Sequence, residues 1–173
     1  MNLQQLLLPA SFFRLCETSR FGHAIKFSQW DFAILETLHI MGIAVLLGST
    51  LVVDLRLLGL GMRRQSVAQL AEELAPWTWG ALALMIATGI PMFFSEAVRM
   101  SLNDSFFFKM IFLVLAISIQ WTIYSRAKRS AAPERAGFGK LVACLSLICW
   151  LSVALAGRGI AFIAIFVRGV RVS

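Results

Sequence analysis

The stretch FAILETLHIMGIAVLLGSTLVV, residues 32–53, decides the fold of this chain. It is almost entirely apolar and is followed directly by Asp54. With a rise of about 1.5 Å per residue, a helix of this length crosses the roughly 30 Å of hydrocarbon in a bilayer. Only helices and closed barrels satisfy their own backbone hydrogen bonds in lipid, so we predict a transmembrane helix here.

Three further apolar blocks follow, at residues 76–94, 106–124 and about 138–157. The chain of 173 residues is 59% hydrophobic and only 14% charged, with a mean hydropathy of +0.80. A soluble domain is about 45–50% apolar and about 25% charged. We therefore predict an all-α, four-helix transmembrane bundle formed by residues 30–173.

The ends of the chain differ from the four blocks. Residues 1–29 interleave apolar and basic side chains, which predicts an extracytoplasmic amphipathic segment that lies on the membrane surface. After the fourth block, Gly157, Arg158 and Gly159 precede another apolar run at residues 160–167. One straight helix through this region would bury Arg158, so we expect a break or bend near Gly157 and an interfacial tail at residues 160–167.

The net charge of +7 is carried by loops and tails, where basic side chains meet lipid headgroups, so we expect no nucleic-acid partner. Lys and Arg gather in the first and third loops between the blocks, whereas the second loop has only Arg99. The positive-inside rule then places the first and third loops in the cytoplasm and both termini outside.

Ionisable side chains inside the blocks are the candidate site residues, because each costs about 2.5–3.5 kcal/mol in a bilayer and needs a partner or a purpose. Glu36 and Lys109 lie about 6 Å and about 5 Å below the outer ends of two parallel helices. We predict that they pair, directly or through water, with His39 about one turn deeper and with Glu96 and Arg158 at the same side. Three interpretations of this cluster remain open. It is a buried ion pair that fixes helix register, or it is a site for a ligand, proton or cofactor. In the third, Lys109 extends to the lipid headgroups and contacts none of the other residues.

A second polar group is expected toward the inner ends of the first and third helices. Thr50 and Asp54 continue the face of the first helix that carries the acidic and imidazole side chains. Gln120 and Tyr124 lie close to one face of the third helix. We predict that these four side chains point into the bundle.

His39 is a candidate haem b ligand, with copper as a weaker alternative and a helix-contact or titrating role as further possibilities. The chain has only two histidines, and His23 lies in the surface segment. A second axial ligand would be either His23 folded over the outer face or one of four methionines, Met41, Met92, Met100 and Met110. No phosphate-binding loop, Ser/His/Asp set or carboxylate pair suggests catalysis, so we predict no enzyme.

Several short motifs resemble an uncharacterised bacterial four-helix inner-membrane family over residues 25–163. They are ETLHI at 36–40, LGS at 47–49, VDLRLLGL at 53–60, PWTW at 76–79, TG at 88–89, Lys109 and AGRGIAF at 156–162. The resemblance implies the fold and a bacterial inner membrane, but little chemistry. The chain is more loosely similar to copper-resistance D-type and b-type cytochrome membrane proteins. Their third helix often carries an inner histidine, where this chain has Gln120 to Tyr124, which disfavours an inner haem.

Three functions fit these observations. The first is a non-catalytic integral membrane subunit that packs against or stabilises a larger inner-membrane complex, with lipid and other membrane subunits as its partners. The second is a b-type haem electron-transfer protein that uses His39. The third is a small proton-coupled transporter that uses Glu36, His39, Thr50 and Asp54, although four helices without an internal repeat are few for alternating access.

Overall fold

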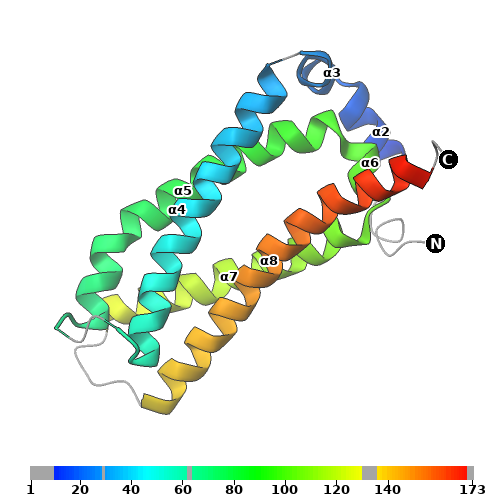
Figure 1. Ribbon diagram of the computed structural model, residues 1–173. Helices are drawn as coiled ribbons and strands as arrows, with labels where there is room; N and C mark the ends of the chain where they lie inside the picture. The colour runs from blue at the N-terminus through cyan, green and yellow to red at the C-terminus, as the bar shows by residue number, and fades with distance from the viewer. Residues whose placement is uncertain (1–9, 29, 62–63, 130–135, 171–173) are drawn as a thin grey trace.

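The computed structural model describes residues 10–28, 30–61, 64–129 and 136–170, and every element in this part of the chain is a helix (Figure 1). Their order is α2 (Ala10–Thr18), α3 (Arg20–Phe27), α4 (Asp31–Leu58), α5 (Val67–Ser95), α6 (Ala97–Ser101), α7 (Asp104–Arg129) and α8 (Ala136–Val170). The side chains of Arg158 and of residues 160–170 lie outside the described part.

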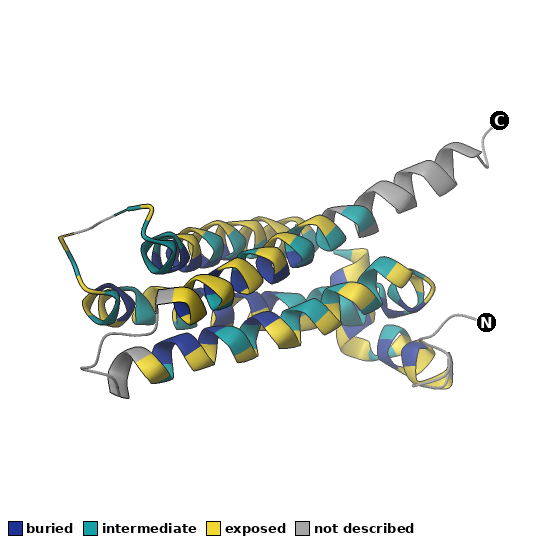
Figure 2. Ribbon diagram, turned by 90° about the horizontal axis from the view of Figure 1, so that it is seen from below, coloured by how far each residue is buried: buried dark blue, intermediate teal, exposed yellow. Residues whose placement is uncertain are grey.

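Four of these helices are long and apolar enough to cross a membrane. The spans are Asp31–Leu58, Val67–Ser95, Asp104–Arg126 and Gly137–Gly157. Between 17% and 33% of the residues in their apolar windows are buried within the chain, so most of each span faces outward (Figure 2). An outward surface this apolar suits lipid and not water. The all-α bundle is confirmed, and the protein is a multi-pass membrane protein by the length and composition of its helices.

The four long helices form a ring in which each packs against two others. α4 packs on α5 and α8, and α7 packs on α8 and α5, which leaves α4 and α7 diagonally opposite. At one end of the bundle lie α2, α3, α6 and the C-terminal end of α8 (Figure 1). We call this the α6 end, and we call the opposite end, which carries the α4–α5 and α7–α8 connections, the loop end. Toward the α6 end, α4 and α8 diverge.

Helix boundaries follow local capping chemistry. The apolar block of the second helix starts at residue 76, but the helix begins at Val67, because Ser66 and Gln69 form a capping box that satisfies two free N–H groups. Pro76 therefore lies inside α5. α4 ends at Gly59, which has a left-handed φ of 80°.

We predicted a break or bend near Gly157, and a break is absent because α8 is a single helix from Ala136 to Val170. A glycine inside a helix costs only about 1 kcal/mol relative to alanine, which is too little to interrupt a helix with apolar residues on both sides. The glycines serve packing instead. A Cβ on Gly159 would lie 3.3 Å from the Ser105 hydroxyl, so the missing side chain lets α8 approach α7 closely. The interfacial placement of residues 160–167 concerns side chains outside the described part.

The N-terminal helices dock on the α6 end. Phe13 and Cys16 of α2 bury themselves against Ala97 of α6 and against Phe93 and Phe94 of α5. Glu17 pairs with Lys26 and accepts the backbone N–H of Val98 at 2.9 Å, which ties α2 to both α3 and α6. Residues 10–28 of the amphipathic segment are thus folded onto the bundle as a pair of short helices.

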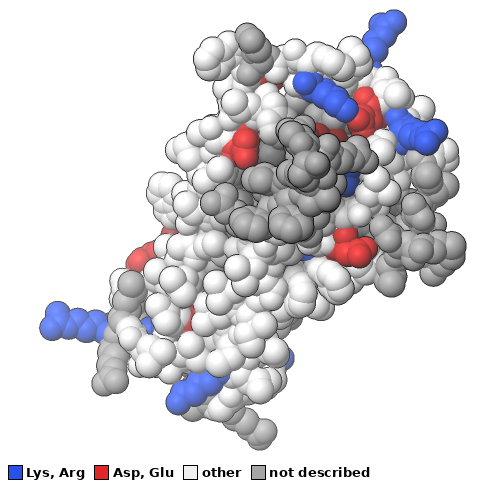
Figure 3. All heavy atoms as spheres, turned by 45° about the vertical axis from the view of Figure 1, so that its right-hand side comes forward, with Lys and Arg blue, Asp and Glu red and all other residues white. Residues whose placement is uncertain are grey.

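Basic side chains are concentrated at the ends of the molecule. On the face drawn in Figure 3, Lys and Arg gather toward the two ends, and a few Asp and Glu side chains lie on the mostly uncharged surface between them. This distribution fits a protein with two polar ends and an apolar belt. The assignment of the loop end to the cytoplasm stays a prediction.

Candidate functional site

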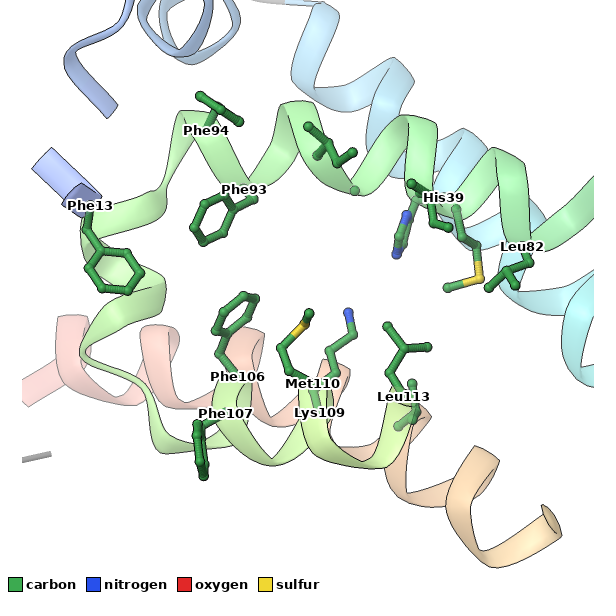
Figure 4. Close-up of a pocket in the computed structure, with 15 residues that line it drawn as sticks. Phe13, His39, Leu82, Phe93, Phe94, Phe106, Phe107, Lys109, Met110 and Leu113 are labelled. Atoms are coloured by element: carbon green, nitrogen blue, oxygen red, sulfur yellow. The ribbon is translucent and has the colours of Figure 1, made fainter. Parts of the chain in front are cut away.

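A cavity of about 550 Å³ opens between α5 and α7 at the α6 end, where the bundle widens. α2 contributes Phe13 to its wall, α4 contributes His39 and α8 contributes Val153 (Figure 4). Five phenylalanines line it, namely Phe13, Phe93, Phe94, Phe106 and Phe107. A volume of this size holds a drug-sized or lipid-sized apolar group.

Two polar side chains reach this cavity, His39 from α4 and Lys109 from the diagonally opposite α7. Figure 4 shows the imidazole and the ammonium group pointing into the space from opposite walls. Both side chains line the same cavity, so one bound molecule can contact both. The cavity is therefore an apolar chamber with one cation and one imidazole.

Hydrogen bonds to Thr88 fix the orientation of the imidazole. The Nδ1 atom of His39 lies 2.8 Å from the Thr88 hydroxyl, which in turn lies 2.8 Å from the carbonyl of Leu84. A carbonyl only accepts, so the single hydroxyl proton goes to Leu84 and the Nδ1–H of His39 donates to Thr88. The carbonyl of Met85 is a further acceptor beside the ring. This arrangement places the proton on Nδ1 and leaves the Nε2 lone pair of the neutral imidazole for a ligand.

Gly89 makes room for the same ring. A Cβ at this position would lie 3.3 Å from Cε1 of His39, which is tighter than most real contacts. Thr88 thus orients the imidazole by a hydrogen bond, and Gly89, which has no side chain, leaves room for the ring. The sequence carried this signal as a Thr-Gly pair, but nothing in one sequence connects that pair to a histidine 49 positions earlier.

The described residues contain no direct ion pair between Glu36 and Lys109, because Glu36 is exposed on α4. The physical reason is the divergence of α4 from α8 at this end, which leaves the face that carries Glu36 uncovered. Within the described part of the chain, no acidic side chain pairs with Lys109. Its Nζ lies near Gly157, 3.7 Å from the position of a Cβ there.

Glu96 pairs with Arg99 at the junction of α5 and α6 and is not among the residues that line the cavity. The side chain of Arg158 lies outside the described residues. Of the predicted cluster, His39 and Lys109 both line the cavity.

Below the cavity, an apolar layer fills the middle of the bundle. We define it as Leu46, Ala81, Leu82, Met85, Ala116, Cys149 and Trp150, which are all buried and in mutual contact. Leu46 is 1% exposed and Ala116 is fully buried, so the four helices are in close contact here. The layer separates the cavity from the loop end, which weighs against a continuous polar path along α4.

Beyond the apolar layer lies a polar layer, which we define as Ser49, Thr50, Asp54, Thr78, Gln120, Tyr124 and Ser146. All seven side chains are buried. Thr78 donates to Ser49 at 2.9 Å and lies 2.8 Å from the Tyr124 hydroxyl, so it links three helices. The four residues predicted to face inward at this end, Thr50, Asp54, Gln120 and Tyr124, are all in the layer.

The residues around His39 allow a test of haem binding. Among the proposed second ligands, Met110 lines the cavity, whereas Met41, Met92 and Met100 are not among the lining residues. His23 is exposed on α3 and stacks on Phe27. One oriented imidazole, one thioether, aromatic walls and one ammonium fit the chemistry of a haem, for which His39 and Met110 would be the iron ligands and Lys109 would offer a charge to a carboxylate.

A set of three or more His, Cys, Asp or Glu side chains that could hold a metal ion is absent from the described residues. A copper site at His39 would therefore depend on methionine sulfur, as the sequence suggested.

Comparisons with known proteins give a family and no function. A family model described as a family of unknown function (DUF6644) matches residues 12–163. No curated protein and no solved structure matches the chain.

Proposed function

Because the chain belongs to this family of unknown function, we propose a role from the site alone: it is a non-catalytic membrane protein that binds an amphiphile with an anionic head in the cavity. The observation that carries this proposal is the Lys109 ammonium, which faces an apolar cavity without an acidic partner among the described residues. An ammonium group in hydrocarbon costs about 2.5–3.5 kcal/mol, and a bound anion offsets that cost.

The wall of the cavity fits the rest of such a molecule. Phenylalanine, leucine, isoleucine and methionine side chains make up nearly all of its lining. An acyl or isoprenoid chain would bury apolar surface against them at about 25 cal/mol per Å². His39 can hydrogen-bond the same head through Nε2 when that atom is protonated, and Lys109 supplies the charge.

The test is binding of a fluorescent long-chain fatty acid to the purified full chain, with the matching fatty alcohol as an uncharged probe. Lys109→Met keeps the length of the side chain and removes its charge. We expect it to weaken binding of the acid by about tenfold or more, because hydrogen bonds to charged groups contribute about 1.5–3 kcal/mol. Binding of the alcohol should change little.

Lys140→Met is the matched control, since Lys140 is exposed near the start of α8 at the loop end. It should leave both affinities unchanged. Equal loss of acid and alcohol binding in Lys109→Met, or no loss of either, would contradict a head-group role for Lys109.

A b-type haem is the second candidate, favoured by the imidazole that Thr88 holds with Nε2 free. When bound, haem supplies one-electron chemistry, and the chain would supply the axial ligand, the apolar walls and a cation. Visible spectra of protein purified from haem-replete cells decide between the candidates. We expect a Soret band that is lost in His39→Ala and reduced in Thr88→Val if haem is the ligand. Without such a band in the parent protein, this candidate fails.

The role of accessory subunit in a larger membrane complex remains a separate proposal. Its support is α7, whose apolar window is only 17% buried within the chain and so leaves the most surface for a partner. Trp121 and Val114 are among its exposed apolar side chains. Purification in mild detergent should then recover a stoichiometric membrane partner, and Val114→Trp should reduce its recovery. A chain that purifies alone would count against this role.

A further inference from the structure

The polar layer at the loop end contains five buried polar atoms without a hydrogen-bond partner, and the adjoining edge of the apolar layer adds a sixth. The five are both carboxylate oxygens of Asp54, both amide atoms of Gln120 and the hydroxyl oxygen of Ser146, and the sixth is Nε1 of Trp150. The exposed fractions of Asp54, Gln120, Ser146 and Trp150 are 0%, 1%, 0% and 3%, respectively. Buried polar groups in folded proteins are nearly always paired, so a concentration of unpaired atoms in one place points to a missing ligand.

Three helices bring these atoms together. Asp54 comes from α4, Gln120 from α7, and Ser146 and Trp150 lie one turn apart on α8. The Ser146 hydroxyl lies beside the Asp54 carboxylate, and the Tyr124 hydroxyl lies near both Asp54 and Gln120, close enough for weak interactions. None of these pairs reaches full hydrogen-bond geometry. The unpaired atoms therefore surround one small region and are not scattered through the bundle.

The charge of Asp54 is not met by any basic side chain in the described residues. The nearest arginine along α4, Arg56, donates from Nε to the backbone oxygen of Gln65 at 2.7 Å and belongs to the following turn. An isolated carboxylate in this setting is costly unless a positive charge neutralises it.

We propose that the polar layer binds one alkali-metal cation, with Asp54 as its charged ligand and with Ser146 and the Gln120 carbonyl oxygen as neutral ligands. Oxygen atoms from carboxylate, hydroxyl and amide groups are the ligands that hard cations take. The single carboxylate decides the charge, because a monovalent ion gives a neutral site, whereas a divalent ion would leave a net positive charge in lipid. The N–H groups of Gln120 and Trp150 are then available to the carboxylate or to a water beside the ion.

The hydroxyls of Ser49 and Thr50 add to this ligand set without competing for it. Each donates its proton to the carbonyl of Leu46, at 3.1 Å and 2.9 Å. The Ser49 oxygen also accepts from Thr78, so one of its lone pairs and both lone pairs of Thr50 remain to face the layer. Asp54 also lies only four residues before the end of α4, about 6 Å from the aqueous side of the loop end. An ion would reach it from that side without crossing the apolar layer.

The experiment measures binding of radioactive sodium to the full chain in detergent at pH 8, with potassium as competitor and choline as the inert cation. We expect saturation near one ion per chain, and a thermal midpoint several degrees higher in saturating sodium or potassium than in choline. Asp54→Asn, which keeps the shape of the side chain, should abolish both effects. Glu36→Gln removes an exposed acid from the same helix and should change neither.

Ser146→Ala is a second test variant, to be used if Asp54→Asn does not fold. It removes one neutral ligand and should weaken sodium binding about tenfold while leaving one site per chain. The proposal is overturned if neither ion binds saturably to the parent protein, if Asp54→Asn binds as well as the parent, or if stability follows pH but not the alkali cation. The last result would identify Asp54 as a buried carboxyl that is neutralised by a proton. None of these outcomes depends on the cavity ligand, so this site and the proposed function are tested separately.

Discussion

Two glycine-to-alanine substitutions should change stability in opposite directions, and the structure gives the reason for each sign. Gly22 lies where α3 crosses the end of α5, and a Cβ there would stand 2.6 Å from the backbone oxygen of Phe94 and 2.9 Å from that of Cys16. A close C···O contact lies at about 3.3–3.6 Å, so the chains must separate by roughly 0.7 Å. Both obstacles are backbone atoms, which cannot rotate away as a side chain would.

The expected cost of Gly22→Ala follows from this displacement. Overpacking of a close contact costs about 1–3 kcal/mol, and the better helix propensity of alanine returns at most about 1 kcal/mol. The net effect should be a loss of up to about 2 kcal/mol in the docking of α3, which also holds the edge-to-face contact of Phe21 with Phe94. Gly80 in α5 is the control, because nothing lies within 4 Å of its Cβ position. Gly80→Ala should therefore be neutral or stabilising.

Hydrogen exchange of the α3 amides measures this docking directly. A loss of about 1.4 kcal/mol raises the population of the open state tenfold, so exchange of these amides in Gly22→Ala should be faster by about that factor. The amides of α8 should exchange as in the parent protein, because the substitution acts on the α6 end alone. Unchanged exchange in α3, or an equal loss of stability in Gly80→Ala, would refute this account of the close approach.

Three further predictions concern other contacts. Partial burial raises the pKa of Glu17, but the hydrogen bonds from Lys26 and from the Val98 N–H and the charges of Lys26 and Arg99 outweigh this effect and hold its pKa below the usual value. A lowered pKa stabilises the docked α2 above the unfolded value of about 4.3, so protease resistance of this segment should fall as the pH drops through the lower folded value, and Glu17→Gln should remove that dependence. Thr78→Val should lower the free energy of unfolding, measured in SDS, by about 1 kcal/mol, because each of its two interhelical hydrogen bonds contributes about 0.6 kcal/mol. Thr122→Val is the control and should lower it by less, because the Thr122 hydroxyl bonds only to its own helix. Gly59→Ala should cost about 1–2 kcal/mol in the same assay, because its φ of 80° disfavours any Cβ although no atom lies within 4 Å of it.

The bundle was predictable because hydrophobic block length is a one-dimensional signal. Each of the four blocks matches a helix that could span a membrane, and the inner polar residues Asp54 and Gln120 are buried as predicted. The start of α5 was missed by nine residues, since hydropathy alone does not detect the capping box at Ser66. Local hydrogen bonding, and not apolar content, sets that boundary.

The outer cluster was only partly predictable, because burial depends on which neighbour covers a helix at each level. Glu36 and Asp54 lie on nearly the same face of α4 at 100° per residue. Asp54 is fully buried beside Ser146 of α8, whereas Glu36 is exposed because α8 has diverged from α4 at that level. Lys109 and His39 meet the cavity because α5 and α7 separate there. A single sequence contains no information on this divergence.

The order of the cavity, the apolar layer and the polar layer along the bundle determines the charge of each proposed ligand. Lys109 and Gln120 are eleven residues apart on α7, so the ammonium lies roughly 16 Å from the level of Asp54. The apolar layer, with Leu46, Met85 and Trp150, fills the space between them. Two opposite charges at that separation cannot form a pair, so each must be neutralised at its own level. A cation in the cavity therefore requires an anionic ligand, and a carboxylate in the polar layer requires a cationic one. If Lys109→Met and Asp54→Asn each altered binding at the other's site, the apolar layer would not be a barrier and this division of the bundle would be wrong.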